Sequence, residues 1–180
     1  ASDDTVVFVL DPSRSHNVPQ AHFAGLTAEQ LNSLMVDRYS GYKAMLQVKN
    51  GIIVLAFCWA HVRRDFVGVG KGFPELVPWA LTWLGHIREL YHLNRERLNH
   101  EASSAEFKLG DTKLREHVEL MRQQRETELA DAKLREPCRK ALISLQEHWN
   151  GLTLFVDDPR LPLDNNRAER LIRNPAVGRK

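Results

Sequence analysis

Residues 50–66 read NGIIVLAFCWAHVRRDF, and the first half of this stretch decides the fold. The run IIVLAF is apolar and of strand length, as are LNSLMVD at residues 31–37 and TVVFVL at residues 5–10. The segments between these runs, residues 16–30 and 38–47, can each hold a short helix. Strands that alternate with helices predict an α/β core.

A long helical stretch interrupts this core. Apolar residues recur at nearly every third or fourth position of residues 74–98, which predicts an amphipathic helix. Residues 113–136 are charged, with a thinner apolar stripe, and we expect their charged side chains to be exposed. Pro137 suits the first turn of a further helix. The first stripe comprises Leu76, Ala80, Trp83, Ile87, Leu90 and Leu98, and the second Leu114, Val118, Met121 and Leu129.

These patterns predict three regions. Residues 1–66 form the first part of the α/β core, residues 67–150 a helical insertion, and residues 151–180 the final segment of the core. The chain begins without a methionine and ends on GRK, which indicates a piece of something longer.

Composition narrows the class of protein. The 180 residues are 43% hydrophobic, which is enough for a real core. The longest apolar run is half of the ~20 residues that span a bilayer, and no basic and then apolar leader opens the chain, so we expect a cytoplasmic protein without a membrane segment. A net charge of +2 does not by itself predict nucleic-acid binding. The basic residues nevertheless outnumber the acidic ones between Arg160 and Lys180.

The terminal stretch LDNNRAERLIRNPAVGRK, residues 163–180, predicts a short helix. Asn166 can be its N-cap, which puts Glu169 at the third helical position in a capping box. Pro175 predicts the end of the helix. Taken alone, this pattern favours a structural role for Glu169.

Asp37 ends the strand-like run LNSLMVD, and a turn residue that accepts backbone N–H groups is the simplest interpretation of it. If the helices are an insertion, however, Asp37 and Glu169 belong to one folding unit, although 169 − 37 = 132 residues separate them. Two carboxylates could then meet.

Cys58 and His61 have the spacing of half a zinc site. A structural zinc ion needs four ligands, and the chain contains no second pair of suitable spacing. We therefore expect buried side chains that bond to each other or to the backbone.

Taken together, DRYSGY at residues 37–42, CWAHVRRDF at residues 58–66 and the terminal stretch resemble the catalytic domain of DDE transposases of bacterial insertion sequences. The specific resemblance is to the family named after insertion sequence sixty-six, and PSRSHNVPQAHFAG at residues 12–25 adds to it. It implies a ribonuclease-H-like fold, interrupted by a helical insertion, whose carboxylate triad binds two Mg²⁺ or Mn²⁺ ions. DNA, as transposon ends and target, would be the partner, and the active complex a homo-oligomer.

The resemblance also implies roles for particular residues. Asp37 corresponds to the second Asp of the triad and Glu169 to its Glu. Cys58, His61 and Asn166 would support the site. The cations that would contact DNA phosphates are Arg170, Arg173, Arg179 and Lys180.

The chain departs from the family pattern at the first catalytic Asp, which belongs in an Asp-Glu-Thr context upstream of residues 5–10. Asp3, Asp4 and Asp11 lack this context and lie too near Asp37. We therefore expect a transposase catalytic fragment that is inactive alone. Two alternatives stay open: a non-catalytic DNA-binding or assembly module, and a ribonuclease-H-like nuclease without strand transfer.

Overall fold

The structure is a computed structural model that describes residues 15–27, 29 and 32–177, with residues 172–177 as backbone only. It divides the chain into two compact units. Residues 1–58 and 164–180 form one, called here the sheet unit, and residues 59–163 form the other, called the helical unit. The strand predicted at residues 5–10 lies outside the described residues.

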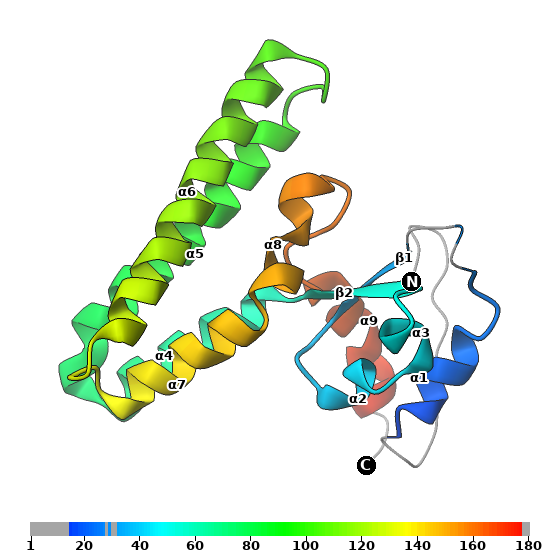
Figure 1. Ribbon diagram of the computed structural model, residues 1–180, viewed down its shortest axis with the longest axis horizontal. Coiled ribbons are helices and arrows are strands. Elements are labelled where there is room, and N and C mark those ends of the chain that lie inside the picture. Colours follow the sequence, from blue (N-terminus) through cyan, green and yellow to red (C-terminus); the bar gives the residue numbers. More distant parts are fainter. Residues whose placement is uncertain (1–14, 28, 30–31, 178–180) are drawn as a thin grey trace. The chain divides into compact units, whose positions relative to one another are not determined.

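The sheet unit contains two parallel strands in its described part (Figure 1). Strand β1, Asn32–Val36, and strand β2, Ile53–Phe57, pair along their whole length, with Val36 opposite Phe57. Both strands were predicted, and the structure confirms them. Helices α2, Ser40–Lys43, and α3, Leu46–Lys49, connect them, and α1, Asn17–His22, precedes β1. The fold is therefore mixed α/β.

The helical unit carries the long helices. Their bounds are α4, Trp59–Gly72; the 3₁₀ turn η1, Pro74–Leu76; α5, Val77–Leu98; α6, Ala105–Ala130; α7, Glu136–Glu147; and α8, Trp149–Asp157. Helices α5 and α6 lie side by side (Figure 1). Because α4 and α8 belong to this unit, it extends beyond residues 67–150 at both ends. The backbone N–H of Trp59 donates to the Leu163 carbonyl at 2.9 Å, which joins the first and last residues of the unit.

Aromatic side chains fill the core of the helical unit. Phe66 of α4 stacks on Trp83 of α5 with ring centroids 5.3 Å apart, and the Trp59 indole N–H donates to the Leu152 carbonyl at 2.8 Å. These rings bury much of the apolar area that stabilises the unit. The start of helix α7 at Glu136, with Pro137 in its first turn, is confirmed.

The prediction for the end of the α5 stripe is wrong. The stripe is buried from Leu76 to Leu90, but Leu98 is 46% exposed. The helical period of the stripe continues instead through Asn94 and Arg97, which are both buried. The stripe therefore ends in polar residues that are paired inside the protein.

Helix α6 departs from the prediction at one cation. Its charged side chains are exposed or half-exposed except for Arg125, which is 4% exposed and lies 4.6 Å from the centre of the Trp149 ring. The face of an aromatic ring can replace part of the water around a guanidinium, so a charged residue can occupy this interior position.

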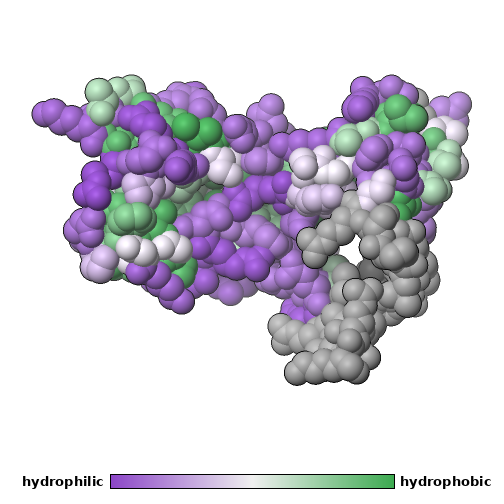
Figure 2. All heavy atoms as spheres, turned by 90° about the horizontal axis from the view of Figure 1, so that it is seen from below, coloured by the Kyte–Doolittle hydropathy of each residue, from purple (hydrophilic) through white to green (hydrophobic). Residues whose placement is uncertain are grey.

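Figure 2 shows one face of the molecule, which is mostly hydrophilic with separate apolar patches. Within the described part of the chain, every helix is too short or too polar to span a bilayer.

The absence of a side chain at Gly110 allows α6 to pack closely against α5. We therefore predict that Gly110→Ala destabilises the protein. A Cβ at this position would lie 2.8 Å from Arg97 Cβ and 3.1 Å from Arg97 Cα. We expect a loss of about 1–3 kcal/mol because a packed interface must shift. The matched control is Gly85→Ala in α5, where the added Cβ has no neighbour within 4 Å and should stabilise by about 0.5–1 kcal/mol. Urea unfolding measures both, and equal effects would contradict the packing role.

Candidate active site

Asp37 follows the last residue of β1. One of its carboxylate oxygens, Oδ1, accepts the N–H of Tyr39 at 3.1 Å, as predicted for a turn residue. The side chain is half-buried. The turn fixes the carboxylate at the carboxyl end of β1, and this contact uses only one of its two oxygens.

Cys58 links three segments of the sheet unit. Its N–H donates to the carbonyl of Val36 at 3.2 Å, and its Sγ lies 3.5 Å from the N–H of Asn165, which donates to it. The side chain is completely buried. Residue 58 therefore lies against the end of β1 on one side and against the residue before the terminal helix on the other. The structure thus confirms that Cys58 is buried and bonded to the backbone.

The terminal helix α9 spans Asn166–Val177. The capping box predicted for it is wrong by one residue. The Asn165 carbonyl accepts the Glu169 N–H at 2.9 Å, so Asn165 is the N-cap and Glu169 is the fourth helical residue. The physical reason is Asp164, whose Oδ1 accepts the Asn166 N–H at 3.0 Å and starts the helix earlier. Helix α9 also continues past Pro175, the residue expected to end it.

Glu169 is an exposed residue of the first turn of α9. A negative charge is favourable there because the helix N-terminus carries a partial positive charge. Arg170 is also exposed, and its Nε donates to the Asn166 carbonyl at 3.3 Å. Arg173 is part of α9 but its side chain is not among those described, and Arg179 and Lys180 lie outside the described residues.

His61 belongs to α4 and hence to the helical unit, whereas Cys58 is the last residue of the first segment of the sheet unit. Among the described residues, no three His, Cys, Asp or Glu side chains are grouped in a way that could hold a metal ion. Asp37 and Glu169 are thus two separate candidate ligands, and neither belongs to a described three-ligand cluster.

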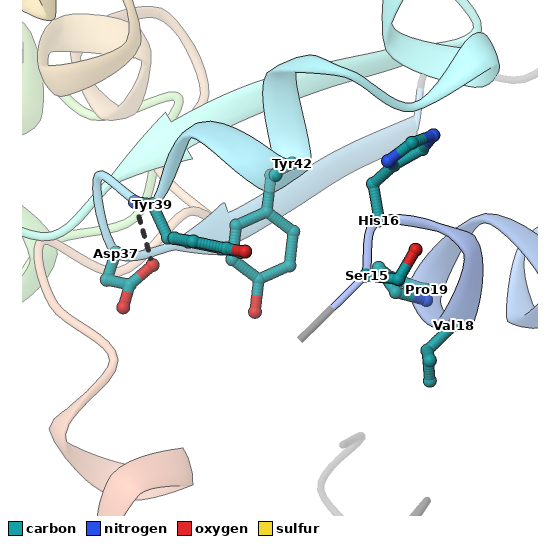
Figure 3. A pocket seen from close by; sticks show the side chains of 8 residues that line it. Ser15, His16, Val18, Pro19, Asp37, Tyr39 and Tyr42 are labelled. Carbon is teal, nitrogen blue, oxygen red and sulfur yellow. Dashed lines mark hydrogen bonds between the residues drawn. The ribbon is translucent and has the colours of Figure 1, made fainter. Parts of the chain in front are cut away.

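Asp37 also borders a pocket of about 420 Å³ in the sheet unit. Burial, followed by the negative charge of Asp37, raises the pKa of the Tyr42 hydroxyl, which lines the same pocket. The pocket was not predicted, because it forms between two segments that are about twenty residues apart in the sequence. The lining residues are Ser15, His16, Val18, Pro19, Asp37, Tyr39, Gly41 and Tyr42 (Figure 3).

Comparison with known proteins defines the class. The model of the family described as "Transposase IS66 family" matches residues 1–180. The chain belongs to this transposase family of insertion sequences.

The curated relatives come from Sinorhizobium fredii. The chain is 32% identical over 184 residues to the uncharacterized protein y4jD, covering 97% of this chain and 34% of the relative. It is 27% identical over 187 residues to the uncharacterized protein y4hP, covering 97% of this chain and 33% of the relative. The chain thus spans about a third of the length of these relatives. No solved structure matches.

Proposed function

We propose that this chain is part of the catalytic core of a transposase that cleaves DNA and joins the freed end to a target. In this proposal the sheet unit has a ribonuclease-H-like fold, and Asp37 and Glu169 are metal ligands. The observation that carries the proposal is the Cys58 contact with Asn165. Through it, residues 107 positions apart come together, so the carboxyl ends of β1 and β2 lie near the start of α9.

The donor set agrees with the metal that the family implies. Asp37 and Glu169 offer carboxylate oxygens, which Mg²⁺ and Mn²⁺ prefer to nitrogen or sulfur. Two such ions would generate a nucleophile from water and stabilise the charge on the leaving 3′ oxygen. Asp37 can supply the oxygen that the Tyr39 N–H does not use. In this proposal a third carboxylate comes from another segment of the protein.

The cations of α9 are suited to hold the DNA backbone. Arg167 and Arg170 are exposed in the first turns of the helix that carries Glu169. Arginine contacts to phosphates fix the register of the duplex without reading its sequence. Arg170, Arg173, Arg179 and Lys180 would therefore position the phosphate, while the carboxylates would hold the metal ions beside it.

A Mn²⁺ titration tests the assignment of the carboxylates. We expect the chain to bind Mn²⁺, and Asp37→Asn and Glu169→Gln each to weaken binding, because each removes one anionic oxygen ligand. The matched control is Glu101→Gln, which removes an exposed carboxylate of the helical unit and should leave the affinity unchanged. Electron paramagnetic resonance of the free ion measures the affinity. Equal affinities in all four proteins would contradict the proposed site.

A further inference from the structure

We propose that the pocket beside Asp37 receives a single unstacked nucleobase of the DNA strand that the site acts on, with Tyr39 as its stacking platform. This inference rests on the proposed function, because it adds a base-binding subsite to the same carboxylate. The occupant would be a base that is part of a DNA strand.

The shape of the pocket supports this inference. Its lining comes from two segments that face each other in Figure 3, the start of α1 on one side and the turn after β1 with helix α2 on the other. The volume of about 420 Å³ lies in the range of small-ligand sites. The wall combines aromatic rings with polar groups, among them Ser15 and His16. A planar base needs both, a ring face for stacking and polar groups for its edge.

The Tyr39 ring is held at the surface by its neighbours. The residue is 45% exposed, so a ligand can reach part of it. The ring lies over Gly41, where a Cβ would overlap it, and meets the Tyr42 ring edge to face at 6.1 Å. A held aromatic ring loses little conformational entropy when a base stacks on it.

The pocket lies directly beside the candidate metal-binding carboxylate. Asp37 itself lines the pocket, and its Oδ1 accepts the backbone N–H of the stacking residue Tyr39. A base in the pocket would therefore belong to a nucleotide next to the phosphate that Asp37 addresses. Bases inside a duplex are stacked, so the pocket should act on frayed or single-stranded nucleotides at the site of cleavage.

Binding to DNA with a short single-stranded overhang tests this inference. The probes are two identical hairpin duplexes, one with normal bases in the overhang and one with abasic residues, so that backbone charge is matched. We expect the full chain, in chelator and at low salt, to bind the base-bearing overhang roughly tenfold more tightly, the size of one aromatic stacking contact. Fluorescence anisotropy gives the ratio of affinities, and quenching of 2-aminopurine in the overhang reports stacking.

Three substitutions separate a stacking role from a folding role. Tyr39→Ala should abolish the preference for bases while keeping the backbone N–H that Asp37 accepts. Tyr39→Phe should keep it, and Gly41→Ala should reduce it because the new Cβ displaces the ring. The control is Phe73→Ala, which removes a 38% exposed aromatic residue of the helical unit and should leave the preference intact.

Equal affinity of the unaltered chain for both overhangs would overturn the inference, as would a preference that survives Tyr39→Ala. Neither result bears on the carboxylates, whose test is metal binding. Equal Mn²⁺ affinities of the unaltered protein and its carboxylate variants, together with a retained preference for bases, would contradict the catalytic assignment but not the base-binding pocket.

Discussion

Glu169→Gln should abolish Mg²⁺-dependent DNA cleavage by a longer transposase of the family that contains this chain. We expect a loss of at least roughly a thousandfold, because ligands that act as one unit are strongly non-additive. The substitution keeps the size of the side chain and one acceptor oxygen but removes the charge that would hold the metal. Nicking of supercoiled plasmid DNA measures the rate, and circular dichroism verifies that the helix content is unchanged.

The matched control is Asp164→Asn, which neutralises a carboxylate five positions earlier in the same segment. The Asn side chain keeps the oxygen that accepts the Asn166 N–H, so the turn before α9 should persist. We expect cleavage within a few-fold of the unaltered protein. Because Glu169 is the fourth residue of α9, a capping box cannot account for an effect at this position. Full cleavage by Glu169→Gln would disprove its catalytic role.

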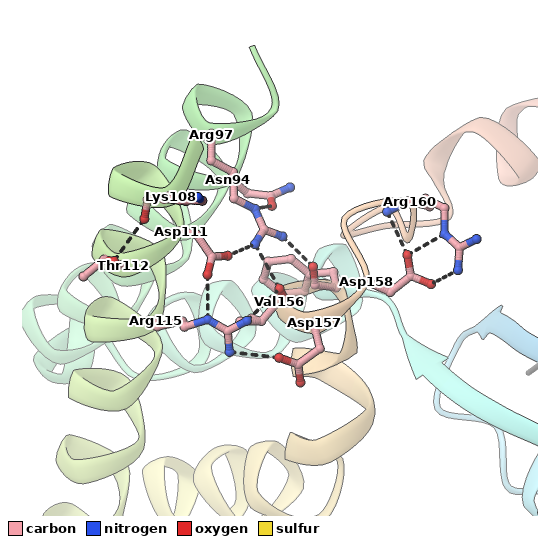
Figure 4. A network of polar contacts seen from close by, with 11 residues as sticks. Asn94, Arg97, Lys108, Asp111, Thr112, Arg115, Val156, Asp157, Asp158 and Arg160 are labelled. Carbon is pink, nitrogen blue, oxygen red and sulfur yellow. Dashed lines mark hydrogen bonds and ion pairs between the residues drawn. The ribbon is translucent and has the colours of Figure 1, made fainter. Parts of the chain in front are cut away.

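Arg97→Met should cost about 3–5 kcal/mol of unfolding free energy, the largest stability effect that we expect in this chain. Arg97 of α5 is fully buried and donates to Asn94, to Asp111 of α6 and to the Phe155 and Val156 carbonyls at the end of α8 (Figure 4). Burial lowers the pKa of its guanidinium while the Asp111 hydrogen bond opposes this, and an arginine stays charged in proteins.

The cost has two sources. Removal of the guanidinium deletes its hydrogen bonds to the Phe155 and Val156 carbonyls. Each hydrogen bond that a buried carbonyl loses lowers the free energy of unfolding. It also removes a positive charge from the C-terminal end of α8, where a cation is favourable. Methionine fills a similar volume, so the loss reports the polar contacts and not a cavity.

Arg115→Met provides the matched control. Arg115 pairs with the same Asp111, at 2.7 Å, and with Asp157 at 2.8 Å, but its side chain is 49% exposed. An exposed ion pair contributes about 0–1 kcal/mol, so we expect a small shift of the urea midpoint. Equal midpoints for the two variants would show that burial of Arg97 contributes nothing.

The elements of the fold with a strong apolar pattern could be predicted from the sequence. The runs at residues 31–37 and 50–57 became β1 and β2, and the stripe from Leu76 to Leu90 became the buried face of α5. Local propensity and periodicity agree in these segments, so no tertiary contact has to decide between alternatives. The turn at Asp37 was predictable for the same reason, since an Asx turn involves residues two positions apart.

The features that depend on contacts between distant segments could not be predicted. The helical period puts Arg97, and not Arg95, on the buried face of α5, but only the tertiary structure supplies its partners, two carbonyls of α8 that lie 58 and 59 positions away. Arg125 is buried because Trp149 covers it. The pocket requires α1 to face the turn after β1, which also depends on tertiary structure.

The hydrogen bond between the Trp59 N–H and the Leu163 carbonyl has an evolutionary consequence. The chain enters and leaves the helical unit at neighbouring points, so the length of this unit can change without moving the two points apart. The entropic cost of closing a segment between two fixed points rises only slowly as the segment becomes longer. Helices could therefore be gained, lost or remodelled within the helical unit while the pairing of β1 with β2 is preserved. Selection can in this way diversify one part of the protein at little risk to the other.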